Sequence, residues 1–161
     1  MAIEIVSVEL DRPLHTAALV SLLDAYARDP MGGGLGLTED TQLALIGALQ
    51  SRQDYVGLLA LHDGVPIGLL NAFEGFSTFA AKPLLNIHDV YVEASTRGQG
   101  IGQRLMIHAE QIARERGCCK LTLEVLAGNL AAQRVYRALG FNAYTLNEDT
   151  GQALFWQKGL S

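Results

Sequence analysis

Cysteine is scarce in this sequence, and the sequence lacks the common metal-binding motifs. The 161-residue chain has two cysteines, Cys118 and Cys119, and adjacent side chains on a strand point to opposite faces, which disfavours a disulfide between them. The sequence holds no CxxC or HExxH pattern, and its four histidines are scattered. We therefore expect no metal site and a reduced, cytoplasmic setting.

Positive charge and long apolar runs are scarce as well. The chain carries 12 Lys and Arg against 17 Asp and Glu, and the net charge of -5 disfavours an electrostatic hold on nucleic-acid phosphates. No apolar run approaches the about 20 residues of a membrane helix, and the start "MAIEIVSVEL" lacks the cationic and apolar regions of a signal peptide. We expect no nucleic-acid partner, no membrane attachment and no export.

Apolar residues, in contrast, are plentiful. They make up 49% of the chain against 18% charged residues, which is enough to build a core and is unlike the composition of disordered chains. A chain of this length suits one domain rather than two. A single domain over residues 1–161 is therefore predicted.

The first half of the chain shows local signals for helices and antiparallel strands. Alternation predicts a strand from Ile3, and helical spacing predicts a helix that ends before Pro30 and a second one capped by Thr38. The glycine-rich tract at 32–36 between these helices is expected to be a turn or a mobile lid. Two apolar runs around Asp63-Gly64 predict a hairpin, and a further strand ends at Val92.

The second half predicts a parallel strand pair. A glycine-rich loop after Val92 leads into an amphipathic helix, which is followed by a strand at 121–126 and a helix capped by Asn129. Two strands joined through one helix form a right-handed parallel unit. Two last strands are expected near "FNAYTL" and "ALFWQK". The prediction is an α/β fold with a mixed sheet and helices on both faces.

The loop "STRGQGIGQRL" is the strongest candidate for a binding site. Free backbone N–H groups that lead into a helix N-terminus favour an anion, and glycine lets a phosphate come close. The alternative is that the glycines only form a tight turn. The dinucleotide fingerprint G-x-G-x-x-G is not met, because Gly98, Gly100 and Gly102 run G-x-G-x-G, and the P-loop pattern is absent.

Several motifs in order resemble one family. Arg97-x-x-Gly100-x-Gly102 matches the Q/R-x-x-G-x-G/A signature of the GCN5-related N-acetyltransferase (GNAT) superfamily. "IHDVYV" resembles the fourth strand of that family and "LTLEV" its fifth. "NLAAQRVYRALGF" reproduces its N-x-x-A-x-x-x-Y-x-x-x-G-F pattern. On these motifs, which span about residues 86 to 142, the chain is identified as a member.

This resemblance implies a fold and a cosubstrate. The fold is α/β (α+β mixed), with a mostly antiparallel, strongly twisted sheet between helices and with splayed fourth and fifth strands. The cosubstrate is acetyl-CoA, with its pyrophosphate on the glycine loop and its pantetheine arm along the fourth strand, near the backbone of Val90 and Val92. The implied cofactor-binding residues are Val90, Tyr91, Val92, Arg97, Gly98, Gln99, Gly100, Ile101, Gly102, Gln103, Asn129, Ala132 and Tyr136.

Two side chains are candidates for proton transfer. The resemblance places the Tyr136 hydroxyl near the coenzyme sulfur as the acid, whereas helical spacing alone favours a core tyrosine. His88 resembles the strand histidine that serves some family members as a base, and the alternatives are a structural histidine or a bound water as base. Alternation puts His88 on the face of Asn86 and Val90, opposite Asp89, so that the two are not paired.

The acceptor site is expected against the first two helices and the third strand. Carboxylates and aromatic rings there suit a cationic amine, although ordinary surface charge and packing would also explain them. The candidate substrate residues are Asp29, Phe73, Glu74, Phe76, Asn86 and Glu124.

The reaction expected from the resemblance is acetyl transfer to a primary amine of a small molecule, by direct attack on the thioester. The alternatives are a protein or peptide N-terminal or lysine acetyltransferase and a catalytically silent CoA-binding sensor. A nicotinamide oxidoreductase is a third alternative. A homodimer is an additional expectation from the resemblance.

Overall fold

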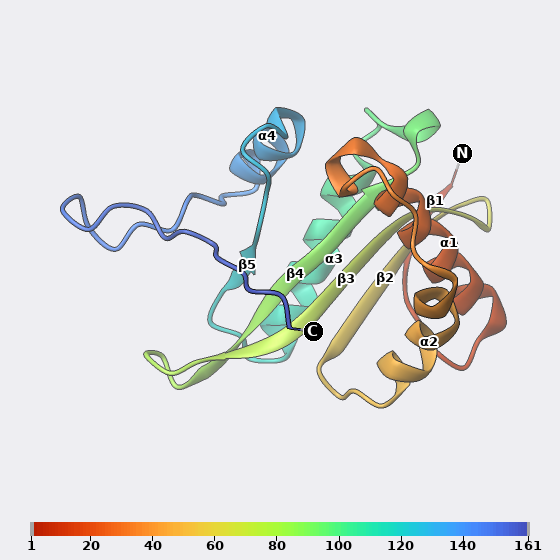
Figure 1. Cartoon of the computed structure of the whole chain (residues 1–161), viewed down its shortest axis with the longest axis horizontal. Helices are drawn as coiled ribbons and strands as arrows, with labels where there is room; N and C mark the ends of the chain where they lie inside the picture. Colours follow the sequence, from red (N-terminus) through yellow and green to blue (C-terminus); the bar gives the residue numbers. More distant parts are fainter. Residues whose placement is uncertain (1, 161) are drawn as a thin grey trace. The chain divides into compact units, whose positions relative to one another are not determined.

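The structure, a computed structural model, describes residues 2–160 (Figure 1). The chain forms two compact units, one up to Leu123 and the other from Glu124 onward. The single domain over residues 1–161 stays a prediction.

The first unit is built on one five-stranded sheet in which each strand pairs with the next along the chain. The first three pairings are antiparallel, and the last is parallel. This arrangement confirms the predicted mixed, mostly antiparallel sheet. The strands are β1 (Ile3–Ser7), β2 (Tyr55–His62), β3 (Val65–Ser77), β4 (Lys82–Val92) and β5 (Leu121–Leu123).

Helices cover both faces of this sheet, as predicted (Figure 1). On one face lie α1 (Pro13–Arg28) and α2 (Glu39–Gln50), and on the other lies α3 (Ile101–Glu115), which connects β4 to β5. Two short 3-10 helices, η1 (Pro30–Gly32) and η2 (Ala94–Thr96), follow α1 and β4. The parallel β4–β5 pair needs such a crossover helix, because a tight turn can join only antiparallel neighbours.

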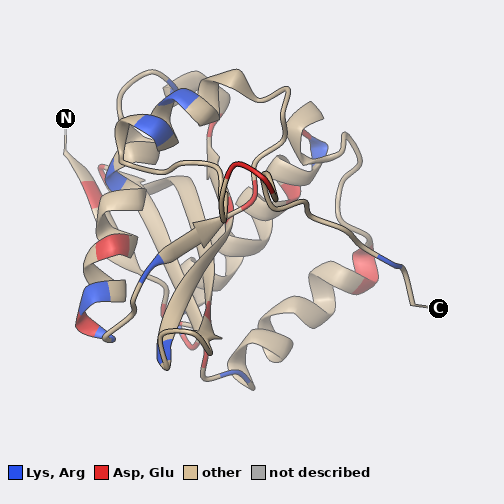
Figure 2. Cartoon of the chain, turned by 90° about the vertical axis from the view of Figure 1, so that its left-hand side faces the viewer, with Lys and Arg blue, Asp and Glu red and all other residues tan. Residues whose placement is uncertain are grey.

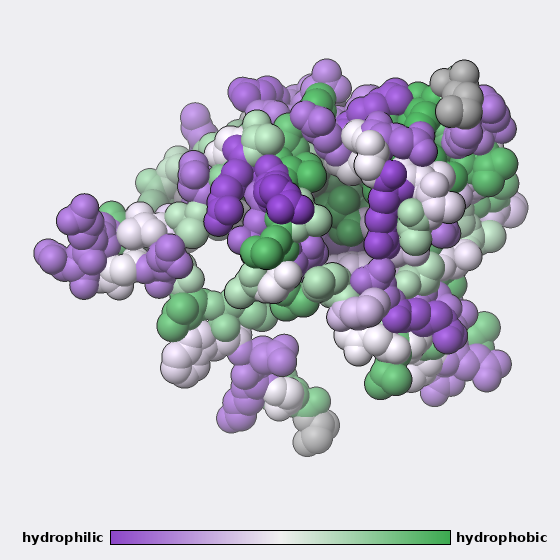
Figure 3. All heavy atoms as spheres, turned by 90° about the horizontal axis from the view of Figure 1, so that it is seen from above, coloured by the Kyte–Doolittle hydropathy of each residue, from purple (hydrophilic) through white to green (hydrophobic). Residues whose placement is uncertain are grey.

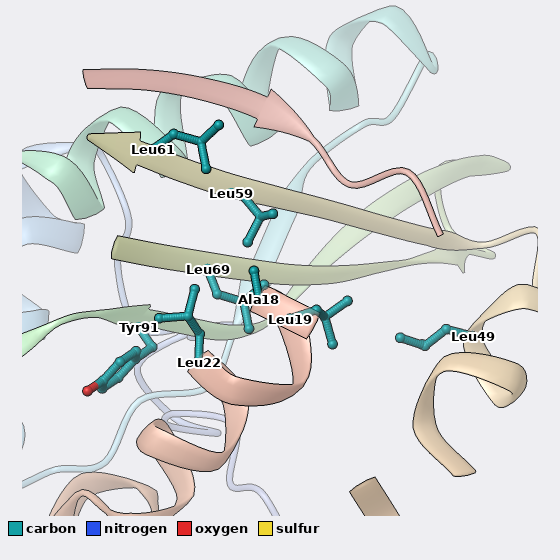
Figure 4. Close-up of a cluster of buried hydrophobic side chains, with 8 residues drawn as sticks. All are labelled: Ala18, Leu19, Leu22, Leu49, Leu59, Leu61, Leu69 and Tyr91. Atoms are coloured by element: carbon teal, nitrogen blue, oxygen red, sulfur yellow. The ribbon is translucent and has the colours of Figure 1, made fainter. Parts of the chain in front are cut away.

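The core follows from the alternation of side chains along β3. Leu69 belongs to the buried cluster beneath α1 and α2, in which Tyr91 lies beside Leu22 with its hydroxyl directed away from the aliphatic side chains (Figure 4). Gly68, the adjacent residue, faces α3, and a Cβ built there would lie 3.3 Å from the Leu105 side chain. Burial of each such aliphatic side chain contributes about 1.5–3 kcal/mol. The sheet is thus packed on both faces.

Local signals explain where the elements begin and turn. The Thr38 hydroxyl accepts a hydrogen bond from the Thr41 N–H at 3.2 Å, which caps α2 as predicted. Asp63 and Gly64 have φ angles of 49° and 82°, the left-handed pair that matches the twist of a two-residue hairpin. The predicted hairpin between β2 and β3 is therefore confirmed.

The second unit contains one regular helix, α4 (Leu130–Ala138). The Asn129 side chain accepts from the Ala132 N–H at 3.2 Å, and Gly140, with a φ of 94°, follows the end of the helix. The two strands predicted beyond it are wrong for the described residues, where this segment forms one isolated bridge between Thr145 and Gln152. A lone two-stranded ribbon is marginal without a face to bury.

Charged and apolar residues are interspersed on the sides of the molecule seen in Figures 2 and 3. Figure 2 shows Lys and Arg in short separate stretches among Asp and Glu, and Figure 3 shows hydrophilic and hydrophobic side chains side by side. Among the helices of residues 2–160, none combines the length and the apolar character that crossing a membrane requires. In the same part of the chain, no group of three or more His, Cys, Asp or Glu side chains is placed to hold a metal ion.

Candidate active site

The glycine loop at the start of α3 presents a row of unused N–H groups. Gly98 and Gly100 have φ angles of 82° and 75°, which favour glycine, and Gly100 caps α3 without a side-chain hydrogen bond. Within residues 2–160, the N–H groups of residues 98–103 donate to no acceptor. Because the positive end of the helix dipole adds to these donors, the loop is suited to an anion such as a phosphate.

Gly102 is a glycine for a different reason. Its φ is not in the left-handed region, and a Cβ built there would meet only the Val92 side chain, at an ordinary 3.9 Å. The protein itself therefore leaves room for a side chain at this position. A ligand that approaches the backbone closely is the simplest physical reason for a glycine here.

One edge of β4 is open beside this loop. In the described part of the first unit, β5 pairs with β4 only along Leu85–Ile87, so residues 88–92 have no partner strand on this edge. The Glu93 N–H bonds to Ile67 on the β3 side at 2.8 Å, and backbone groups alternate between the two edges, so those of Val90 and Val92 face the open edge. An extended ligand can add to such an edge like a strand.

Arg97 is fixed by three contacts. Its Nε donates to the Val92 carbonyl at 2.9 Å, its Nη2 pairs with the Asp29 carboxylate at 3.1 Å, and its guanidinium lies 5.5 Å from the Tyr91 ring centre. Asp29 also accepts from the Met31 N–H at 2.9 Å, and this bond, followed by Arg97, lowers the pKa of the Asp29 carboxyl. This ion pair thus links Arg97, which was predicted to bind the coenzyme, to Asp29, which was predicted to bind the acceptor.

A β-bulge interrupts the pairing of β3 with β4. Asn71 pairs with Asp89, but the next residue, Ala72, pairs with Ile87, which leaves His88 as the extra residue on β4. A bulge bends its strand and changes the direction of the side chains around it.

The bulge corrects one prediction from the sequence. The His88 ring packs edge-on against Phe73, with 5.6 Å between ring centres, and Phe73 lies two residues after Asn71 on the same face of β3. The Asp89 carboxylate bonds to the Asn71 side chain on this face. The prediction that His88 and Asp89 lie on opposite faces is therefore wrong, because an inserted residue breaks the alternation.

Three side chains on this face form a polar chain that sequence reasoning missed. The Tyr55 hydroxyl donates to Asn71 Oδ1 at 2.7 Å, and Asn71 Nδ2 donates to Asp89 Oδ2 at 3.1 Å. Asn71 is buried, and burial, with the nearby Asp89 charge, raises the pKa of the Tyr55 hydroxyl. A buried amide needs hydrogen-bond partners. The signal in the sequence was a lone asparagine inside the apolar run "IGLLNAF".

The other predicted acceptor residues of the first unit are spread along β3 and β4, and of these Asn86 lies directly opposite Phe73. Glu74 pairs with Arg116 at 3.5 Å, and Asn86 donates to the Thr122 hydroxyl at 3.0 Å across β4 and β5. Phe76 is exposed and pairs with Pro83 near the β3–β4 turn, at the end of the ribbon away from Val92. Of the predicted set, Asp29 lies beside the glycine loop through Arg97, and Phe73 lies beside the bulge.

The remaining predicted residues belong to the second unit. The Tyr136 ring packs against Phe141 with 5.9 Å between ring centres, and Asn129 caps the helix that carries Tyr136. Glu124 is exposed. The roles of Tyr136, Asn129, Ala132 and Glu124 toward the coenzyme or the acceptor stay predictions.

Comparison with known proteins identifies relatives among acetyltransferases. The chain is 45% identical over 74 residues to streptothricin acetyltransferase of Streptomyces lavendulae, a match that covers 46% of this chain and 39% of that protein. The chain thus spans less than half the length of this relative.

Two solved structures share the fold. The crystal structure of a probable acetyltransferase matches with a TM-score of 0.80 and 26% identity, over 97% of this chain and 99% of that one. An aminoglycoside N-acetyltransferase in complex with CoA matches with a TM-score of 0.75 and 20% identity, over 98% and 95% of the two chains.

A family description matches most of the chain. The sequence model of the "Acetyltransferase (GNAT) family" aligns with residues 19–141, a span that contains the open edge of β4, the glycine loop and α4. This match confirms the predicted family, whose description names acetyltransferases. The chain belongs to the acetyltransferase (GNAT) family.

Proposed function

We propose that this chain transfers the acetyl group of acetyl-CoA to a primary amine of a small molecule, by direct attack of the amine on the thioester. The observation that carries the proposal is the row of unused N–H groups at 98–103 close to the end of the open edge of β4, where a Cβ built on Gly102 would lie 3.9 Å from the Val92 side chain. A ligand with a phosphate group and an extended amide-bearing arm fits both features together. Coenzyme A has this composition.

The binding residues follow from this fit. The pyrophosphate takes the amides of residues 98–103, and the amides of the pantetheine arm bond to the backbone groups of Val90 and Val92 on the open edge. The Val92 carbonyl already accepts from Arg97, so Val90 carries the larger share of this pairing. Arg97 then supports the loop through its fixed contacts and adds positive charge beside the phosphates.

The chemistry requires a neutral amine, a donor for the developing oxyanion and a proton for the leaving thiolate. His88, exposed at the bulge, is the proposed base, either directly or through a bound water. The Val90 N–H is the proposed oxyanion donor, and Tyr136 is the proposed acid. Asn129 and Ala132 support the coenzyme from the helix that carries Tyr136.

Direct attack is favoured because the cysteines are poorly suited to a covalent step. Burial is the main cause that raises the pKa of the Cys118 thiol, which reduces its thiolate form. The Cys119 N–H bonds to Pro83 at 2.8 Å, near the β3–β4 turn and away from Val90. A covalent acetyl-cysteine therefore has no suitable thiol beside the proposed site.

The names of two comparison proteins support a small-molecule acceptor, since one is a streptothricin acetyltransferase and the other an aminoglycoside N-acetyltransferase. The alternatives are a protein or peptide N-terminus or lysine as acceptor, and a CoA-binding sensor without turnover. The cysteine usage supports a cytoplasmic setting. A homodimer without a nucleic-acid partner completes the proposal.

The test is release of CoA from acetyl-CoA, followed by thiol detection, with a panel of small amines and with peptides that carry a free N-terminus or a lysine. We expect release with at least one small amine, and we expect Tyr136→Phe to lower kcat by about 10²-fold or more through loss of the acid. Unchanged turnover in Tyr136→Phe would remove the acid assignment. CoA binding without release for every acceptor would favour the sensor.

A further inference from the structure

The Asp89 carboxylate has one hydrogen-bonded oxygen and one without a partner. Its Oδ2 accepts from Asn71 Nδ2 at 3.1 Å. In residues 2–160, no Lys, Arg or His lies within ion-pair distance of this half-buried group, although seven such pairs form elsewhere. Because Asp89 is only partly buried, its second oxygen stays accessible and can accept from a cationic ligand.

The surrounding residues hold this carboxylate in place. A carboxylate can only accept, so Asn71 presents its NH₂ to Asp89 and its carbonyl to the Tyr55 hydroxyl, which must donate. Gly57 makes room for this arrangement, because a Cβ built there would collide with the Tyr55 hydroxyl. Asn71 is only 4% exposed. The chain is thus built to keep Asp89 as an oriented acceptor.

Aromatic rings flank the same region. Tyr26 stacks on Tyr91 with 5.9 Å between ring centres, and burial, followed by the charges of Asp89 and Asp29, raises the pKa of the Tyr26 hydroxyl. Asp29 is already neutralised by Arg97, whereas Asp89 is not. An uncompensated anion among aromatic rings is suited to an ammonium group.

We propose that Asp89 binds a second cationic amino group of the acceptor, with Asn71 and Tyr55 as its positioning residues. The inference rests on the proposed acetyl transfer and names its acceptor class as a small diamine or polyamine. An ammonium held by a carboxylate keeps its proton and cannot attack, so the reacting amine is a different one. The proposal assigns that amine to His88, the adjacent bulge residue, so a short diamine suits the two positions.

The experiment compares putrescine, which carries two amino groups, with aminobutanol, in which a hydroxyl replaces one of them. For the full-length protein we expect kcat/KM for putrescine to exceed that for aminobutanol by about 10- to 100-fold, the range of a charged hydrogen bond. Asp89→Asn should remove most of this preference by raising KM for putrescine. It should leave aminobutanol turnover within about twofold of wild type, as should Asp11→Asn, an exposed carboxylate control, for both substrates.

Tyr55→Phe tests the positioning role while Asp89 stays intact. Loss of the hydroxyl should raise KM for putrescine less than Asp89→Asn does, with kcat for aminobutanol unchanged. This variant also decides the question if Asp89→Asn does not fold. Equal use of the two substrates by wild type, or a preference that survives both substitutions, would overturn the inference.

Direct binding separates this inference from the proposed function. If no amine releases CoA, acetyl transfer fails, and calorimetric titration of putrescine still tests Asp89. Binding by wild type that Asp89→Asn weakens at least tenfold would support the site. Equal or absent binding in the two proteins would overturn it.

Discussion

Gly102 is a glycine that the fold does not require. It lies in the first turn of α3, and the space around it admits a methyl group without a close contact. Gly98 and Gly100, in contrast, are needed for their left-handed backbone. A substitution at Gly102 can therefore change ligand binding without lowering the stability of the fold. A substitution at Gly98 or Gly100 would strain the backbone and so affect both.

The change Gly102→Ala should leave the free protein at least as stable as wild type, because alanine is favoured over glycine in a helix by about 1 kcal/mol. Its methyl group should obstruct the pyrophosphate and weaken CoA binding by about tenfold, which is about 1.4 kcal/mol. Calorimetric CoA titration and thermal unfolding measure the two effects.

Gly47→Ala is the matched control for this helix effect. Gly47 lies inside α2, and a Cβ built there meets nothing within 4 Å. The Gly47→Ala variant should be more stable than wild type, and its affinity for CoA should be unchanged. CoA affinity in Gly102→Ala equal to that of wild type would mean that the phosphates lie elsewhere.

The residues of the candidate site were predictable to different degrees. The glycine loop was recognisable because left-handed backbone and free amides select glycine at fixed spacing. The pairing of Asp89 with Asn71 and Tyr55 was not, because a period of two along β4 carries no sign of the residue that the bulge inserts at His88.

The loop between α1 and α2 is held at both ends by aspartates. Asp24 accepts from Arg28 Nε at 2.9 Å and from the Leu37 N–H at 2.8 Å, and Asp29 joins the loop to Arg97. The Arg28 bond, followed by the Leu37 bond, lowers the pKa of the Asp24 carboxyl. The role of residues 32–36 as a lid stays a prediction.

Asp29→Asn should remove part of the acid sensitivity of the fold. Because the folded-state pKa of Asp29 is lowered, its contribution is present above the unfolded value of about 3.9 and is lost as pH falls through the folded value. At pH near 7 the variant should be less stable than wild type by at most about 1 kcal/mol, since the pair is partly exposed. The difference should vanish at the most acidic pH, as urea unfolding at both pH values would show.

The matched control is Asp11→Asn, which should unfold like wild type at both pH values. Asp11 is exposed and has no hydrogen bond or ion pair in the described residues. An Asp29→Asn penalty of the same size at neutral and acidic pH would contradict the assigned ion pair.

Local signals predicted elements well where the signal and the partner lie close in sequence. Asp63-Gly64 fixed the hairpin, and the spacing of Leu105 and Ala109 indicated α3. The strands expected near "FNAYTL" and "ALFWQK" failed because their pairing depends on contacts that alternation does not specify. Trp156 is 82% exposed there.

At the scale of the whole molecule, composition and topology constrain function differently. The net charge and the lack of long apolar runs led us to expect neither a nucleic-acid partner nor membrane attachment. The order of strands and helices along the chain is consistent with the acetyltransferase (GNAT) family. The family match over residues 19–141 crosses from the first unit into the second, so the residues that resemble the family lie in both units. The proposed function therefore depends on which molecule binds at the glycine loop.

Thermal unfolding with acetyl-CoA, CoA, NADH and ATP, each at the same concentration, tests this identity most directly. Saturation to about 100 times the dissociation constant stabilises a fold by about 2.7 kcal/mol, which for a domain of this size raises Tm by about 5 to 10 °C. We expect such a rise with acetyl-CoA and CoA alone. No rise with either of them, or a larger rise with NADH, would contradict it.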